Sequence, residues 1–160
     1  MIREGVADAD RLGLAGFCYG GYLTLCALAR SKRFKAASVG AAFADLYSLY
    51  GQTDIPRLLV EYFGDVPWKA RPRYERHSPI FAVHEIVTPT LFQHSEYDRR
   101  VPWTHSLQVY NVLKENGVPT ELVVYPRQEH LITDPRMNAE SMRRNVIWFD
   151  RWLKGGVGER

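Results

Sequence analysis

The sequence contains little cysteine, with only Cys18 and Cys26 among 160 residues. The two do not form a CxxC pair, and no cysteine–histidine cluster has the spacing of a zinc site. If residues 19–30 form one helix, the two thiols lie too far apart along it for a disulfide. Two reduced thiols are typical of a cytoplasmic protein, which is the location we expect. The sequence implies neither a metal nor an organic cofactor.

The sequence also lacks long apolar runs and long runs of one charge. No stretch is long enough to cross a membrane, and the first ten residues contain no apolar signal core. The formal net charge is only +3, and no basic run alternates with aromatic residues. We therefore expect neither a membrane nor a nucleic-acid partner. Hydrophobic residues make up 46% of the chain, which is enough for the core of one domain.

What the sequence does contain is an alternation of short apolar runs and amphipathic stretches. The apolar runs predict four buried strands, at residues 11–17, 34–43, 89–94 and 120–126. Helical spacing and end signals predict helices at residues 19–30, 54–64, 102–117 and 134–156, with one more short turn within 72–81. The last helix is expected to bury one apolar face, formed by Met142, Val146, Phe149 and Leu153. Such alternation predicts an α/β fold whose sheet is mostly parallel, with about four strands and flanking helices.

The stretch "GFCYGGY", residues 16–22, has the pattern of a nucleophile turn between a strand and a helix. A sharp turn of this kind favours Gly16 and Gly20 beside the reactive residue, because side chains there would collide. Cys18 would stand at the start of the helix, whose positive end favours a thiolate. The backbone N–H of Tyr19 would be one oxyanion donor. Taken alone, the pattern is equally that of a tight turn without chemistry.

Two further reactive residues follow later strands of the predicted sheet. Asp98 comes after the third strand and His130 after the fourth, and ligands bind at the carboxyl ends of such strands. Nucleophile, acid and histidine is the chain order of the α/β-hydrolase triad. His130 would take the thiol proton and return it to the leaving group, while Asp98 would orient the imidazole. Asp45, just after the second strand, is an alternative acid.

Several stretches, in this order, resemble the C-terminal part of the prolyl oligopeptidase family catalytic domain: "DRLGLAGFCYGGYLTL", "SPI", "TPTLFQHSEYDRRVP", "LKENGVPTELVVYP", "EH" and "WFDRWLKG". The resemblance covers nearly the whole chain. It implies an α/β-hydrolase fold and hydrolysis of a small peptide or ester substrate through an acyl-enzyme. By motif, it places the nucleophile at Cys18, the acid at Asp98 and the histidine at His130.

Three departures from the family pattern shape the remaining expectations. The family nucleophile is serine, so the Cys18 enzyme is expected to have reduced activity. The acid loop begins His94–Ser95 where the family usually has His-Gly. The chain begins just before the nucleophile strand, so we expect a truncated fold: one partial domain over residues 1–160, with a leader at 1–10 and a frayed tail at 155–160.

The cysteine leaves two other functions open. Dienelactone hydrolases resemble this arrangement, because they combine a Cys-His-Asp triad with a GxCxGG turn on the same fold. A catalytically inactive domain kept for assembly or binding is the second alternative. If the strands lie in chain order, the first strand is an unprotected sheet edge. We therefore expect a homodimer through that edge, whose partner could supply a second oxyanion donor.

Overall fold

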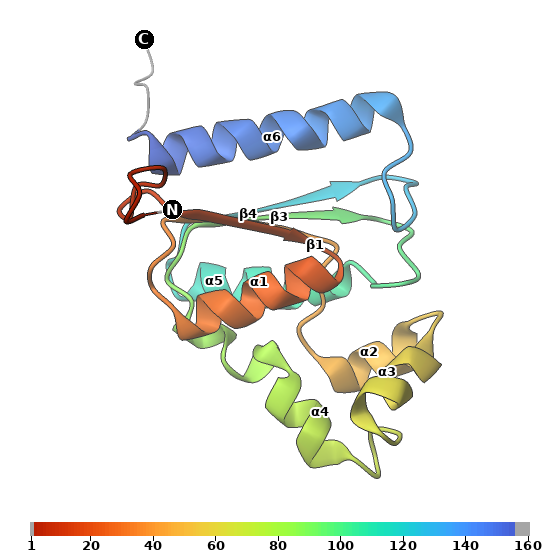
Figure 1. The fold of residues 1–160 in the computed structure, drawn as a ribbon. Helices are drawn as coiled ribbons and strands as arrows, with labels where there is room; N and C mark the ends of the chain where they lie inside the picture. Colours follow the sequence, from red (N-terminus) through yellow and green to blue (C-terminus); the bar gives the residue numbers. More distant parts are fainter. Residues whose placement is uncertain (1, 156–160) are drawn as a thin grey trace.

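The sheet consists of four parallel strands that lie side by side in chain order, as the sequence predicted. They are β1 (Gly13–Phe17), β2 (Ala36–Gly40), β3 (Thr90–Ser95) and β4 (Thr120–Tyr125). This computed structural model describes residues 2–155, so the expected frayed tail at 155–160 lies outside the described residues except for Gly155. All four carboxyl ends meet at one edge of the sheet, where the loops that follow them gather (Figure 1).

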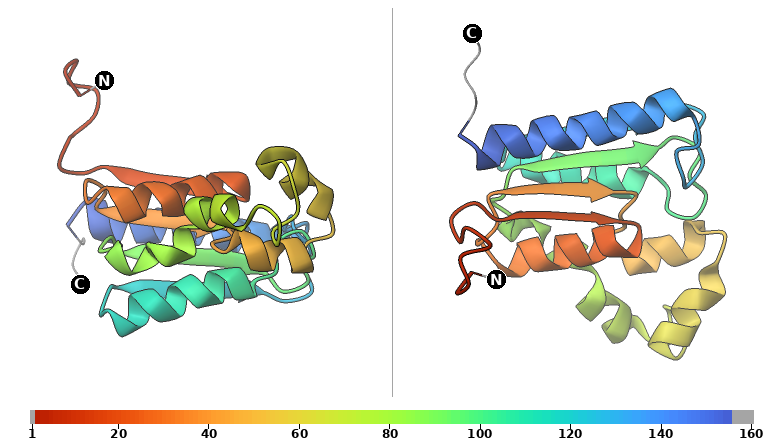
Figure 2. Two further views of the ribbon diagram at one scale, coloured as in Figure 1. Left: turned by 90° about the horizontal axis from the view of Figure 1, so that it is seen from below. Right: turned by 45° about the horizontal axis from the view of Figure 1, so that its top comes forward.

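Helices cover both faces of the sheet, which gives the α/β sandwich predicted from the sequence (Figure 2). Helices α1 (Tyr19–Arg30) and α5 (Thr104–Glu115) lie on one face, and α6 (Pro135–Leu153) lies on the other. The main core lies between the sheet and the first pair. It consists of apolar side chains that include Leu25, Leu28, Val39, Phe92, Val109 and Leu113. Leucine and valine at helical spacing on α1 and α5 therefore account for this layer.

Three short helices lie between β2 and β3 and extend from the carboxyl end of the sheet (Figure 1). They are α2 (Leu46–Gln52), α3 (Pro56–Phe63) and α4 (Arg71–His77), and two 3₁₀ turns follow at Pro79–Phe81 and Val83–Glu85. The sequence predicted α3 and α4 but not α2, which is seven residues long and too short to show a period. The three helices share a second core, which includes Tyr22, Phe43, Leu46, Leu49, Leu59 and Tyr74.

The buried face of α6 differs from the predicted one. Met142 and Val146 are each 61% exposed, whereas Trp148 is buried against Ala36 and Leu91. Asn145 faces the sheet instead, and its side-chain oxygen accepts hydrogen bonds from Ser38 and Gln93. The prediction is confirmed for Phe149 and Leu153, which pack against this core. It was wrong for Met142 and Val146, because these strands present polar side chains to the helix, so a polar residue satisfies them better than an apolar one.

Strand β1 lies at an edge of the sheet and, among residues 2–155, pairs with β2 alone. Ala15 is exposed and Phe17 is 45% exposed, so apolar surface adjoins the unpaired backbone. Within the same residues, no helix combines the length and apolar character needed to cross a bilayer. The open edge leads to a proposal about assembly.

We propose that two copies associate through the β1 edge, because an unpaired parallel strand with apolar neighbours is a template for strand addition. Sedimentation at micromolar concentration should give a mass near twice the 18.4 kDa of one chain. Ala15→Lys, which places a charge on the edge, should shift the protein toward monomer, whereas Val87→Lys at the far end of the sheet should not. A monomer at all concentrations tested would contradict the proposal.

Candidate active site

Cys18 occupies a strained turn between β1 and α1. Its backbone has φ 56° and ψ −117°, a conformation that a residue with a side chain rarely adopts. The surrounding chain holds it there, because its N–H donates to the Gly40 carbonyl at 2.8 Å and its carbonyl accepts from Tyr22 N–H at 3.0 Å. The sulfur consequently stands over the first turn of α1, beside the N–H of Tyr19. This is the geometry in which a helix start favours an anion.

The collision that the sequence predicted for side chains at Gly16 and Gly20 occurs at Gly16 but not at Gly20. A side chain at Gly16 would begin 2.1 Å from the carbonyl oxygen of Gly20, so position 16 admits only glycine. Gly20 itself faces open space, with nothing within 4 Å of an added Cβ, so the predicted collision there is wrong. The second restricted position is Gly21, where a Cβ would lie 2.7 Å from the Gly40 carbonyl oxygen. Close approach of α1 to β2 therefore sets this requirement.

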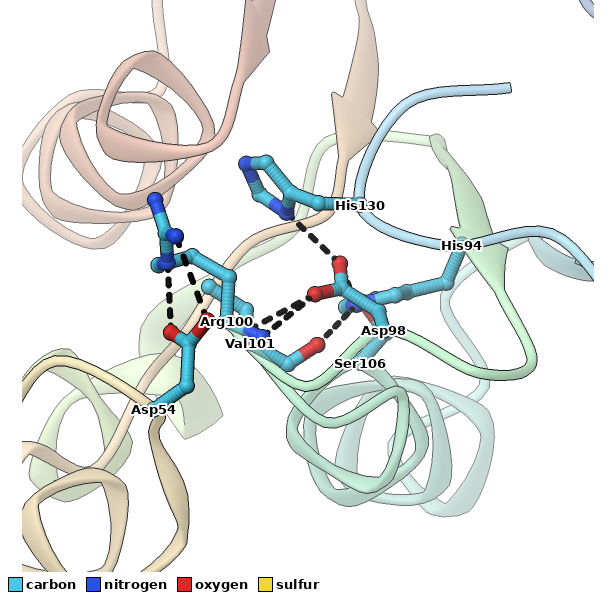
Figure 3. A network of polar contacts seen from close by, with 7 residues as sticks. All are labelled: Asp54, His94, Asp98, Arg100, Val101, Ser106 and His130. Carbon is cyan, nitrogen blue, oxygen red and sulfur yellow. Dashed lines mark hydrogen bonds and ion pairs between the residues drawn. The ribbon is translucent and has the colours of Figure 1, made fainter. Parts of the chain in front are cut away.

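Asp98 follows β3, and its carboxylate is fully buried and surrounded by donors. One oxygen accepts from the backbone N–H groups of Arg100 and Val101, each at 2.9 Å. The other oxygen accepts from Nδ1 of His130 at 2.8 Å. Figure 3 shows the backbone of residues 100–101 and the ring of His130 converging on this carboxylate. Burial opposes its ionisation, but the hydrogen bonds from His130, His94 and Val101 hold the pKa of Asp98 well below its usual range.

His94 supports the acid loop through hydrogen bonds to two other segments. Its Nε2 donates to the Val101 carbonyl at 2.7 Å, and its Nδ1 pairs with the Ser106 hydroxyl at 2.8 Å. Since a carbonyl can only accept, Nε2 must carry the proton, and Nδ1 is free to accept from Ser106. The same Nε2 lies 3.4 Å from Asp98. His94 thereby links β3, the acid loop and α5 (Figure 3).

His130 lies in the loop after β4, between Asp98 and Cys18. Its Nδ1 is committed to Asp98, so Nε2 is left for the thiol of Cys18, whose interaction with the ring raises the pKa of His130. The ring also packs against Phe17, with centroids 5.2 Å apart. These contacts bring His130 between Cys18 and Asp98, although the three residues are far apart in the chain.

The electrostatics of the pair favour a thiolate and an imidazolium. The hydrogen bond to Asp98, and then the one to Cys18, raise the pKa of His130 to about 9 against the effect of burial. The hydrogen bond to His130 lowers the pKa of the Cys18 thiol, again against burial. Cys26 differs, because burial raises its pKa. The thiol of Cys18 therefore ionises more readily than that of Cys26.

Asp45, the alternative acid, and Asp134, which lies four residues after His130, have structural roles. The Asp45 side chain accepts from Tyr47 N–H and caps α2, while Asp134 accepts from the N–H groups of Arg136 and Met137 and caps α6. Of these acids, Asp98 is the one hydrogen-bonded to His130. The structure thus brings together Cys18, His130 and Asp98 and leaves Asp45 at a helix end.

Sequence reasoning missed the apolar cavity beside Cys18. The cavity has a volume of about 100 Å³. Its walls come mostly from the second core and from α3, and they include Tyr19, Tyr22, Phe43, Leu59, Tyr62 and Phe63. Arg100 brings a charge to the lining, and Asp54 holds its guanidinium through contacts of 2.6 and 3.2 Å (Figure 3). No single motif marks this cavity, because its walls converge only after α2 and α3 have folded over the turn.

Comparisons with known proteins agree with this architecture. The sequence model of Peptidase_S9, the prolyl oligopeptidase family, matches residues 1–156. The acylamino-acid-releasing enzyme of Arabidopsis thaliana is 32% identical over 96% of this chain and 21% of its own length. Dipeptidyl-peptidase 5 of Porphyromonas endodontalis is 30% identical over 96% of this chain and 23% of its own. The chain thus spans about a fifth to a quarter of these curated relatives.

The solved acylaminoacyl peptidase of Pyrococcus horikoshii superposes with a TM-score of 0.90 and 30% sequence identity. The match covers 99% of this chain and 27% of that one. The four-stranded sheet and its flanking helices therefore have the same arrangement as part of an α/β-hydrolase peptidase.

The turn geometry predicts that alanine has unequal effects on stability at Gly16 and at Gly20. Gly16→Ala should strongly destabilise the fold or displace α1, because the new Cβ would meet backbone at 2.1 Å. Gly20→Ala should leave the stability within about 1 kcal/mol of the parent, because the added methyl meets open space and alanine favours a helix. Urea unfolding of the two variants measures the difference. Equal losses would show that the turn is not packed as described.

The electrostatics predict that the two cysteines react at different rates. At about pH 7, iodoacetamide should alkylate Cys18 at least ~10-fold faster than Cys26, since the pKa of Cys18 is lowered and that of Cys26 is raised. His130→Ala should slow Cys18 at that pH, because the His130 ring is the largest cause of the lowered pKa of Cys18. Peptide mapping by mass spectrometry gives both rates in one sample. Equal rates for the two thiols would contradict the ion pair.

Proposed function

The chain belongs to the prolyl oligopeptidase family, and on that premise we propose that it hydrolyses ester or peptide bonds through an acyl-enzyme formed on Cys18. The observation that carries the proposal is the 2.8 Å hydrogen bond from His130 to the buried Asp98, supported by the mutual effect of Cys18 and His130 on their pKa values. A nucleophile, a base and a group that orients the base are the minimum set for this chemistry.

In the proposed reaction, the Cys18 thiolate attacks the substrate carbonyl and a tetrahedral oxyanion forms. The N–H of Tyr19, at the start of α1, is directed toward the sulfur and is the proposed donor to that oxyanion. His130 then gives its proton to the leaving alcohol or amine, and water releases the acyl group. Asp98 acts as a positioning residue, since its bond to Nδ1 aims Nε2 at the sulfur throughout.

The apolar cavity suggests which substrates fit. Its walls are aromatic and aliphatic, so an apolar acyl group or side chain next to the scissile carbonyl would bury surface there. Arg100, fixed by Asp54, can donate to a substrate carbonyl at the same site. Aryl esters should react faster than amides, because an amine leaves less readily and depends more on a complete oxyanion hole.

A panel of aryl esters and peptide amides with apolar acyl groups tests the proposal. Cys18→Ala and His130→Ala should each lower ester hydrolysis by about 10³-fold or more. The matched control is Cys26→Ala, which removes the other thiol and should retain the activity. Unchanged rates in both Cys18→Ala and His130→Ala would end the proposal and favour a domain kept for assembly or binding.

Cys18→Ser separates the remaining alternatives. If the site is built around a serine, the variant should be more active, most clearly on amides, because oxygen is smaller than sulfur and better aligned with the oxyanion donors. If serine abolishes an existing activity, the chain works as a cysteine hydrolase of the dienelactone type. The comparison requires only the same substrate panel.

A further inference from the structure

The reactive atom of this site is sulfur, so the acyl-enzyme of the proposed function is a thioester rather than an oxygen ester. Sulfur donates electrons poorly into the carbonyl, which leaves that carbonyl more open to attack by amines. A thiolate is also a better leaving group than an alkoxide, because its conjugate acid has a far lower pKa. The chemistry of Cys18 therefore favours amines over water as acceptors of the acyl group.

The hydrogen bond between His130 and Asp98 also favours amines over water as acceptors of the acyl group. Water needs a base to remove its proton as it attacks, whereas a neutral amine attacks without one. Asp98 is fully buried and bonded to Nδ1 at 2.8 Å, and it keeps that bond when Cys18 is acylated. Its charge favours the protonated ring, which cannot serve as a base for water. An amine such as a free α-amino group, with a pKa of about 8, is partly neutral near pH 7 and can therefore attack.

The surface beside the pair provides a separate place for an acceptor. A cleft of about 570 Å³ is lined by Phe17, Leu131 and Ile132 together with polar groups of β2, β3 and α6. It shares no lining residue with the apolar cavity beside Cys18. Phe17 precedes Cys18 and packs on the His130 ring, and Leu131 follows His130, so the cleft adjoins both reacting groups. Leu131 is 63% exposed and has apolar surface left to bury.

We propose that this site transfers apolar acyl groups from esters to primary amines that carry an apolar side chain, and that this amide formation outruns hydrolysis. The inference rests on the proposed acyl-enzyme at Cys18. The acyl group occupies the cavity lined by Tyr22, Phe43 and Leu59, and the side chain of the amine occupies the cleft at Phe17 and Leu131.

The reaction balances without any further reactant. The Cys18 thiolate forms an S–C bond to the ester carbonyl, the C–O bond breaks, and the leaving alcohol takes the proton of His130. The amine nitrogen then forms a C–N bond and the C–S bond breaks, which restores the thiolate. The His130 ring regains a proton from the solvent once the alcohol has left, and the proton lost by the amine passes to the solvent. No group is oxidised or reduced, and the product is an amide in place of an acid.

The experiment supplies the 4-nitrophenyl ester of N-acetylphenylalanine with L-phenylalaninamide or glycinamide as acceptor. Nitrophenolate release measures acylation, and liquid chromatography with mass spectrometry measures the ratio of amide to acid. Cys18→Ala gives the background of direct aminolysis. The intact protein should form mostly amide, and Cys18→Ser should lower the amide-to-acid ratio by about tenfold or more, which corresponds to ~1.4 kcal/mol.

Leu131→Ser tests the acceptor cleft without altering the nucleophile. It should lower the amide-to-acid ratio by about threefold or more with L-phenylalaninamide, since part of a leucine contact is lost, and leave the ratio with glycinamide unchanged. Val87→Ser, an exposed residue before β3 at the other end of the sheet, is the matched control and should change neither ratio.

The outcomes separate this inference from the proposed function. Release of nitrophenolate with acid as the only product would overturn acyl transfer and leave the hydrolase standing. An equal amide-to-acid ratio for Cys18 and Cys18→Ser would do the same. No release above the Cys18→Ala background would overturn both. A ratio insensitive to Leu131→Ser would remove the acceptor cleft from the proposal.

Discussion

The buried carboxylate of Asp98 is the interaction on which the arrangement of the site depends. An ionised group without solvent is costly unless donors surround it, and here two backbone N–H groups and the His130 ring do so. The backbone donors fix the acid loop, and the ring donor fixes the loop after β4. Two loops from different strands are therefore held together by one charge, and the remaining ring nitrogen is aimed at Cys18.

The backbone of Cys18 is strained, and contacts with the rest of the fold hold it in this conformation. Its positive φ is held by hydrogen bonds to β2 and within α1. Close packing of α1 on β1 leaves no room for a side chain at Gly16, and the close approach of α1 to β2 leaves none at Gly21. The same packing directs the start of α1 at the sulfur. The strained turn, the packing of α1 and the start of that helix thus together position the Cys18 sulfur near the imidazole of His130.

The surroundings of the reactive pair are asymmetric, and this asymmetry gives the site its expected selectivity. On one side, the short helices after β2 enclose an apolar cavity in which Arg100 is the charged residue of the lining. The cleft at Phe17 and Leu131 is wider and mixes apolar side chains with the amides of α6. The smaller, apolar space suits an acyl group that stays in place during turnover, whereas the larger one suits a molecule that enters later and leaves in the product.

Local pattern in the sequence by itself determined the strands, most of the helices, the chain order of the sheet and the three loops that carry Cys18, Asp98 and His130. This was possible because apolar runs, glycine turns and helix caps act over a few residues. Only the tertiary structure decided which face of α6 is buried, since the polar side chains of Ser38 and Gln93 select Asn145 over Met142 and Val146. It also decided that Gly21, not Gly20, meets β2, and that α2 and α3 enclose a cavity beside the sulfur. These features arise from contacts between segments far apart in the chain, and no local pattern records such contacts.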